Sequence, residues 1–295
     1  MFRNLRLKRT PDEVIIDPSA LTREWLAKDA DTPIRLGQIN DLPDSAKKRI
    51  YRSLLPADLL TRFDIDPITW QGLRGEEQVE LKANPDSSVV HISVSGGDAS
   101  PEEFYRLEIG DNSYNGIDIH LLLLNDPNAE SFRTDIDDQG RPTSFGTVRR
   151  NLEEEQRAMR AGLAPGQIRI SLGASKIVFQ LLDSFFMTLG QRSYFFEPLT
   201  YASAWVFERR GCAYVRGHKL MDHIHKEFQP GGALYKSLDG RSPFRQSDQW
   251  NSVRGRAWAI QDGILEAVDE KWDNLRMIKQ VGRHAGVETY PDAIY

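Results

Sequence analysis

The chain has almost no cysteine and no long apolar run. Cys212 is the single cysteine among 295 residues, so an intramolecular disulfide is excluded, and so is a zinc site built from several thiolates. The richest apolar run, residues 119–124, is far shorter than the ~18 residues that a membrane-spanning helix needs. The basic start, residues 1–9, is not followed by the apolar segment of a secretory signal. We therefore expect a cytoplasmic protein that has no membrane partner.

Positively charged residues are fewer than negatively charged ones. The chain carries 38 Lys and Arg residues against 43 Asp and Glu residues, a net charge of −5. A negatively charged surface repels a phosphate backbone, so we expect no nucleic-acid partner. The hydrophobic share of 40% and the charged share of 27% are those of an ordinary globular protein. The composition is compatible with one large or two modest domains and with a homodimer.

The first part of the chain, residues 1–75, has the apolar spacing of helices. The spacing recurs in three segments, at residues 18–28, 45–55 and 56–63. Pro67 then ends the pattern, because a proline keeps the preceding residue out of the helical region. We therefore expect a helical N-terminal segment.

Beyond residue 76 the periodicity changes from helical to alternating. Apolar and β-branched residues recur with strand spacing in four runs, at residues 79–83, 89–94, 104–109 and 117–124. Turn sequences such as Asn115-Gly116 separate the runs. The pattern predicts an antiparallel meander of three or four strands. The last of them is apolar on both sides at its end and is therefore expected to be central.

A helix–strand–helix–strand unit follows, and we expect the rest of the chain to be arranged around it. Apolar residues on one helical face predict a long helix that stops at Gly190. Residues 194–199 predict a short buried strand, and Thr200 stands where the N-cap of a second helix is expected. That helix covers residues 201–210, and residues 212–215 form the next strand. The order is that of an α/β unit.

Two long connections complete the chain. Residues 125–166 are polar and contain a short helix at residues 151–161. They are either an insertion before the α/β unit, or part of a different topology in which residues 167–171 form a strand. Near the end of the chain, residues 254–277 have the pattern of a helix.

The expected fold class is α+β. Its parts are the helical N-terminal segment, a central mostly antiparallel sheet with α/β elements in residues 76–228, and a C-terminal loop and helical cap in residues 229–295. The cap is expected to pack on the core.

Residues 167–217 resemble the core of the GNAT-type N-acyltransferases. In that family a turn written Gln/Arg-x-x-Gly-x-Gly/Ala opens a long helix and binds acetyl-coenzyme A. Arg169 and Ala174 align with the ends of this turn, while Leu172 stands where the family has glycine. Residues 207–212, Phe-Glu-Arg-Arg-Gly-Cys, resemble the family's second signature, Tyr-Glu-x-x-Gly-Phe.

The resemblance implies a protein that binds acetyl-coenzyme A or another acyl-coenzyme A. It also implies a GNAT-like sheet that splays to admit the pantetheine arm. Backbone N–H groups of the turn would face the pyrophosphate, with a guanidinium as clamp and with the Leu172 side chain directed into the core. The cofactor-binding residues are then Gln167, Arg169, Ser171, Gly173 and Ala174.

Acyl transfer to an amine needs a base for the amine proton and an acid for the leaving thiolate. Glu197 follows the strand beside the turn and is the candidate base. Tyr201 or Tyr214 is the candidate acid. The sequence does not indicate the acceptor substrate.

Two other functions fit the sequence. His218, His223 and His225 are the basis for a metal- or small-ligand-binding protein, since on a strand the last two would face the same way. In a helix they would diverge by about 200°, and nearby lysines oppose a cation, so we predict no metal there. The other function is a non-catalytic interaction protein on an acyltransferase-like scaffold, which the side chain of Leu172 favours.

Arginine and aromatic residues gather near the C-terminus, in the loop 238–245 and at Trp250, Arg254, Arg256 and Trp258. This mixture suits an anionic ligand or a partner surface, and equally a coil that covers a hydrophobic sheet. Two more histidines, His91 and His120, lie in predicted strands, where they could flank a cleft or sit satisfied in the core.

Overall fold

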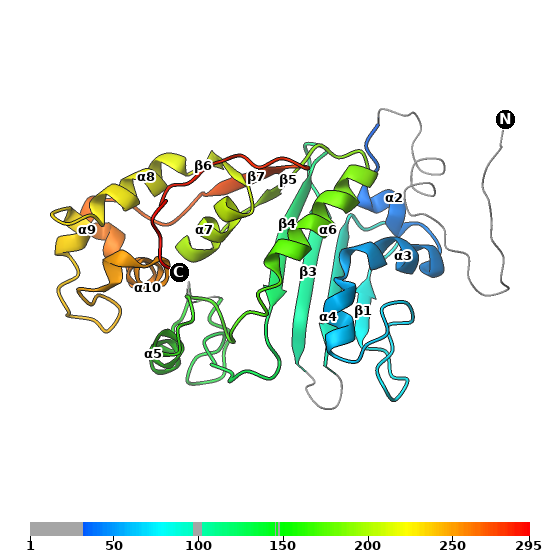
Figure 1. The fold of residues 1–295 in the computed structure, drawn as a ribbon, viewed down its shortest axis with the longest axis horizontal. Coiled ribbons are helices and arrows are strands. Elements are labelled where there is room, and N and C mark those ends of the chain that lie inside the picture. The colour runs from blue at the N-terminus through cyan, green and yellow to red at the C-terminus, as the bar shows by residue number, and fades with distance from the viewer. Residues whose placement is uncertain (1–31, 97–101, 145, 147) are drawn as a thin grey trace.

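The computed structural model describes residues 32–96, 102–144, 146 and 148–295. Their fold is α+β, built on one seven-stranded sheet with the strand order β1-β2-β3-β4-β5-β7-β6 (Figure 1). None of the described helices combines the length and the apolar character that crossing a membrane requires.

The strands are β1 (Val79–Lys82), β2 (Val89–Ser95), β3 (Glu103–Asp111), β4 (Ile117–Leu124), β5 (Ser193–Phe196), β6 (Ala213–Arg216) and β7 (Arg276–Gln280). The α-helices are α2 (Leu36–Asn40), α3 (Asp44–Tyr51), α4 (Ala57–Arg62), α5 (Leu152–Arg160), α6 (Ser175–Thr188), α7 (Tyr201–Arg209), α8 (His218–Glu227), α9 (Ala233–Lys236) and α10 (Val253–Gln261).

Helices α3, α4 and α6 cover one face of the sheet (Figure 1). The ring of Tyr51 on α3 lies 6.0 Å from that of Phe185 on α6. The hydroxyl of Tyr105 on β3 donates to the carbonyl of Leu54, 2.8 Å away, just beyond α3. The two helices predicted between residues 45 and 63 are therefore formed. The helix predicted at residues 18–28 lies outside the described residues.

The predicted meander is confirmed by β1 to β4, which pair antiparallel in chain order. Burial alternates along β2: Val90 and Ile92 are fully buried under the helices, and His91 between them is only half-buried. The opposite face of the sheet, which carries Arg106 and Glu108 of β3, is called the outer face below. The alternation arises because successive side chains of a strand point to opposite faces.

Strand β5 joins the meander to the second half of the sheet. It pairs parallel with β4 and antiparallel with β7, and β7 also pairs antiparallel with β6. Two buried aromatic residues of β5 fix its position against α6: the Tyr194 ring is 4.8 Å from Phe186, and the Phe196 ring is 5.3 Å from Phe179. The sheet is therefore mixed, with a single parallel pair at its centre.

The C-terminal part is less helical than the sequence predicts. Helix α10 ends at Gln261, and the segment as far as residue 277 does not continue it. Left-handed backbone at Gly263 (φ 83°) and Asp269 (φ 54°) interrupts the chain, because a right-handed helix cannot pass through such residues. Strand β7 then enters the sheet between β5 and β6. Residues 276–280 thus belong to the core sheet and not to a helical cap.

Residues 125–170 form a long connection between β4 and α6, which is called the insertion below. The insertion leaves the end of β4 and returns to it, with an antiparallel bridge between Asn125 and Ser171. The N–H of Asp126 donates to the carbonyl of Ile170 at 2.8 Å, and that of Leu172 donates to Leu124 at 3.2 Å. The turn that opens α6 therefore stays beside the end of β4, as it would without the insertion.

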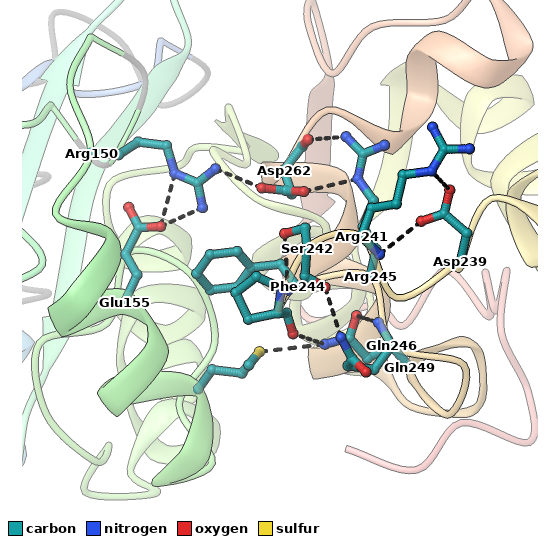
Figure 2. Close-up of polar contacts among 12 residues, drawn as sticks. Arg150, Glu155, Asp239, Arg241, Ser242, Phe244, Arg245, Gln246, Gln249 and Asp262 are labelled. Atoms are coloured by element: carbon teal, nitrogen blue, oxygen red, sulfur yellow. Dashed lines mark hydrogen bonds and ion pairs between the residues drawn. The ribbon is translucent and has the colours of Figure 1, made fainter.

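Ion pairs tie the insertion to the C-terminal part of the chain (Figure 2). Arg150 binds Glu155 and also Asp262, the latter with Nη1 and Oδ1 3.0 Å apart. Arg245 donates from Nε to the other oxygen of Asp262 at 2.8 Å. A small apolar cluster spans the same two parts, comprising Phe132, Ala158, Leu163, Phe244 and Trp258. Arg245 is thus neutralised within the protein, which favours an anchored coil here over an anion site.

Substitution of Leu182 tests whether helix α6 packs into the hydrophobic core. Leu182 is fully buried, so Leu182→Ala is expected to lower the free energy of unfolding by about 2–5 kcal/mol through lost burial and a cavity. Urea unfolding measures this change. Met187→Ala on the exposed side of α6 serves as control and should cost far less. Equal stability of parent and Leu182→Ala would show that α6 does not bury this face.

Candidate functional site

Strands β4 and β5 separate soon after they meet. They pair at only three positions, Ile117–Tyr194, Asp118–Phe195 and Ile119–Phe196. Strand β5 ends at Phe196, while β4 continues to Leu124. Within the described part of the chain, no strand pairs with residues 120–123 of β4 on the side of β5.

A β-bulge lies where the two strands part. In the pairing with β3, Ile109 faces Ile119 and Glu108 faces Leu121, so His120 is an extra residue. His120 is exposed although β4 is the middle strand of seven. The three leucines that follow are all half-buried, without the alternation of a strand covered on one face. Among the described residues, the far half of β4 therefore combines half-buried leucines with a strand edge that no strand pairs with.

The turn at residues 171–174 stands at the end of this edge. Asn125 donates its N–H to Phe104 of β3, so the carbonyl of the preceding Leu124 points to the opposite side, that of β5. The N–H of Leu172 binds that carbonyl. The Leu172 side chain packs against the main core, as the acyltransferase resemblance requires. Gly173 is exposed with a left-handed φ of 71°, a conformation that favours glycine.

Two of the predicted cofactor-binding side chains serve the insertion instead. The Arg169 guanidinium is buried, where it binds the carbonyls of Pro127 and Ala129 and the carboxylate of Glu102. Gln167 accepts the N–H of Ala164 at 2.7 Å. The Nη1 and Nη2 groups of Arg169 are thus engaged away from the turn. The turn itself, with Ser171, Gly173 and Ala174, remains at the surface or half-buried.

Two other cations stand at this turn. Lys176 lies in the first turn of α6, which contains no acidic residue and has no side-chain cap. Arg210, which follows α7, donates from Nε to Ser175 Oγ at 3.2 Å. No ion pair with a carboxylate is found for either cation among the described residues. A helix N-terminus already carries partial positive charge, so this arrangement favours an anion.

Glu197, the candidate base, lies beside the point where β4 and β5 separate. It directly follows the last paired residue of β5, and its side chain is 66% exposed. Arg276 of β7 holds it, with Nη1 and Oε1 2.9 Å apart. The same guanidinium binds Asp118 of β4 at 2.8 Å. Arg276 therefore bridges β4 and the end of β5 on the outer face.

The two predicted acids are engaged elsewhere. Tyr201 is 1% exposed, and its hydroxyl accepts from buried Arg256 at 3.5 Å. Burial raises its pKa to about 12. The hydroxyl of Tyr214 donates to Glu208 at 2.6 Å, and burial raises its pKa as well. Glu208 is fully buried and also binds Thr289, so this contact anchors the end of the chain. In this structure both hydroxyls are therefore hydrogen-bonded within the protein.

The three histidines proposed as ligands lie on helix α8 and not on a strand. His223 faces Glu270, at 3.4 Å, whereas His225 packs against Tyr290 and Arg256. The described residues contain no group of three or more side chains that could hold a metal ion. The alternative site therefore does not assemble in this structure.

Comparisons with known proteins give no family for this chain. No family model, curated protein or solved structure matches it.

The fold brings three further residues to this region. No role was predicted for Lys176 or Arg210, although Arg210 directly precedes the glycine of the second signature. His120 was predicted either to flank a cleft or to lie in the core. One signal for it exists in the sequence: it is the single polar residue in the apolar run 119–124.

The pH dependence of stability can test the contact between His225 and buried Arg256. The Nδ1 of His225 lies 3.2 Å from Arg256 Nη1, and because a guanidinium can only donate, this nitrogen must accept and stay unprotonated. Burial and then Arg256 lower the pKa of His225. In the unfolded chain this histidine binds a proton near pH ~6.5, whereas in the folded chain it binds one only at lower pH. The contribution of His225 to the free energy of unfolding is therefore present above pH ~6.5 and is lost as the pH falls toward the folded pKa.

Urea unfolding between pH 7.5 and 5.5 (about one unit either side of the free imidazole value) measures this effect. His225→Gln is expected to lose less stability than the parent over this range. His218→Gln removes an exposed histidine from the same helix and should keep the slope of the parent. A His225→Gln variant with an unchanged slope would contradict the assignment.

Proposed function

We propose that this protein binds acetyl-coenzyme A or a related acyl-coenzyme A and transfers the acyl group to an amine. The observation that carries the proposal is the short pairing of β4 and β5, with the turn of α6 at the end of the uncovered edge. The resemblance to GNAT-type N-acyltransferases implies both a splayed sheet and a turn in this position.

Each part of the ligand has a counterpart in this region. The pyrophosphate would lie against the turn at residues 171–174, where Lys176 and Arg210 supply positive charge. The pantetheine arm would follow the half-buried residues 121–123 of β4, whose far half lacks a strand partner. The thioester would then reach Glu197, where the strands part. Arg210 takes the place that the sequence analysis gave to Arg169.

A second candidate is a non-catalytic interaction protein on the same scaffold. Phe207 stands where the family's second signature has tyrosine, so that hydroxyl is missing. Both predicted acids are engaged within the protein. These observations favour a scaffold that binds a partner without catalysing, and calorimetry with coenzyme A separates the two cases, because such a scaffold needs no coenzyme.

Gly173 is the first residue to change. A Cβ at this position meets no atom within 4 Å, so a larger side chain would project over the turn. Gly173→Val is expected to abolish binding of coenzyme A, measured by calorimetry, because it blocks the turn and disfavours its left-handed backbone. Circular dichroism and urea unfolding should show a retained fold. Absence of heat from the parent up to millimolar coenzyme A would leave the interaction protein as the remaining candidate.

Arg210 and its neighbour form a matched pair. Arg210→Ala is expected to weaken coenzyme A binding by about 1.5–3 kcal/mol, the usual contribution of one charge-assisted hydrogen bond. Arg209→Ala removes the same side chain one residue earlier, where Arg209 is bound to Glu288, and should leave affinity unchanged. Equal effects of the two changes would mean that Arg210 contributes only general charge.

A further inference from the structure

Residues 284–295, called the strap below, contact helices α7 and α10 after the chain has left the sheet. They follow β7 without forming a helix or a strand, and they run toward α10 (Figure 1). Thr289 and Tyr290 are buried, whereas the other residues of the strap are exposed or half-buried. These two residues therefore anchor the strap in the protein interior.

The two anchor residues contact two buried charges. Thr289 donates its N–H and its hydroxyl to the carboxylate of Glu208 on α7, at 3.0 and 2.7 Å. The ring of Tyr290 lies over the guanidinium of Arg256 on α10, 3.7 Å from its Cζ. Glu208 and Arg256 are both fully buried. The strap therefore links one buried charge on α7 with one on α10.

The Arg256 guanidinium depends on a neutral His225. The acceptors that it binds are uncharged: the carbonyl of Trp250, the hydroxyl of Tyr201 and Nδ1 of His225. Within the described part of the chain, its Nη2 has no hydrogen-bond partner. Protonation of His225 would remove one acceptor and place a second positive charge beside the first, with the two nitrogens 3.2 Å apart. Two buried charges of the same sign without a counter-ion are strongly unfavourable.

The other charged groups near His225 do not offset this repulsion. Asp222 of α8 and Asp292 of the strap favour the protonated form, yet burial and then Arg256 keep the pKa of His225 below its ordinary value. The Asp222 side chain is 60% exposed and Asp292 is exposed as well, so water screens both carboxylates. The ring of Tyr290 lies 5.1 Å from that of His225. Departure of Tyr290 would therefore admit water to both cations.

The strap also holds the end of α7. Ala285 donates its N–H to the carbonyl of Gly211 at 3.1 Å. The two segments are so close that a Cβ added at Gly211 would lie 2.9 Å from the Cα of His284. Glu288 forms an ion pair with Arg209. Together with the contact at residue 208, the strap thus fixes the chain on both sides of position 210.

We propose that the strap leaves α7 and α10 when His225 binds a proton, and that Arg210 then loses its fixed position at the turn of α6. The second part of this inference rests on the proposed binding of an acyl-coenzyme A. With the strap in place, Arg210 donates from Nε to Ser175 Oγ at 3.2 Å. Without it, α7 loses the contacts at residues 208, 209 and 211, and a bound anion loses an ordered cation. Acid therefore weakens anion binding at the turn.

The first test measures the strap directly and uses no ligand. Hydrogen exchange is followed by mass spectrometry in peptides that contain residues 285–290, where the N–H groups of Ala285 and Thr289 donate to α7. Each rate is divided by that of an unstructured peptide at the same pH. A free imidazole changes from about 10% to about 90% protonated between pH ~7.5 and ~5.5, so protection of the strap should fall by up to about 10-fold.

Peptides from β2 and β3 are the control for this measurement. Their protection should be the same at both pH values, because the sheet stays folded while the strap opens. Equal loss of protection in the sheet and in the strap would show general unfolding and would overturn the inference.

Substitutions of His225 separate its charge from its shape. His225→Gln stays neutral and keeps an oxygen that can accept from Arg256, so the acid response should disappear. His225→Lys carries a positive charge at neutral pH and should open the strap at pH ~7.5. His218→Gln, on the same helix, should respond to acid as the parent does. An acid response that persists in His225→Gln overturns the inference, and this variant decides even where His225→Lys fails to fold.

The second test measures coenzyme A affinity by calorimetry at pH ~7.5, where the charge of His225 is changed by substitution and the charge of the ligand is not. His225→Lys should weaken binding, by no more than Arg210→Ala does, and His225→Gln should match the parent. In the Arg210→Ala background, His225→Lys should have no further effect, because both changes act on one contact. A merely structural role of His225 would instead give additive losses.

The outcomes are distinct. An open strap with unchanged affinity overturns the link to Arg210. A strap that keeps its protection in acid overturns the whole inference and leaves the proposed function intact. Absence of binding by the parent overturns the proposed function together with the link to Arg210, while hydrogen exchange still decides whether His225 controls the strap.

Discussion

Three residue pairs between β4 and β5 join the two halves of the sheet. Parallel pairing of this length is weak by itself, and two additional contacts support it. On the covered face, the rings of Phe179, Phe196 and Phe207 lie within 6.0 Å of one another. On the outer face, Arg276 of β7 reaches across β5 to bind Asp118 of β4, and it also binds Glu197 at the end of β5. Because these contacts fix the strands at one end, the strands can part at the other without loss of the sheet.

Local pattern predicted most of the elements. The alternation of β1 to β4 and the one-sided apolar face of α6 come from neighbours in the chain, which a single sequence displays. Strand β7 was missed because its five residues follow a helix-like segment, and its partners lie on strands far earlier in the chain. The insertion could be recognised only from the bridge between Asn125 and Ser171. The spacing of apolar residues along the chain does not indicate such a contact.

The candidate site was predictable in its backbone and not in its side chains. The turn and the inward Leu172 were expected from the resemblance, and the place of Glu197 at a strand end was expected from the strand pattern. Side-chain roles depended on distant partners. Arg169 is bound to Glu102, 67 residues away. Tyr214 is hydrogen-bonded to the carboxylate of Glu208, which also accepts a hydrogen bond from Thr289. His120 is exposed where β5 separates from β4, and β5 begins seventy-three residues later, at Ser193.

The late position of β7 in the chain also constrains how the molecule is made. Strand β5 is complete at Phe196, yet its second edge stays unpaired until residues 276–280 have been synthesised, and β6 finds its partner only then. During translation the growing chain therefore carries two open strand edges over some eighty residues of synthesis. Such an intermediate invites edge-to-edge pairing with another nascent copy. The half of the sheet beyond β5 therefore closes last, and its pairings join segments much farther apart in the chain than the hairpin pairings of β1 to β4, which slows its formation.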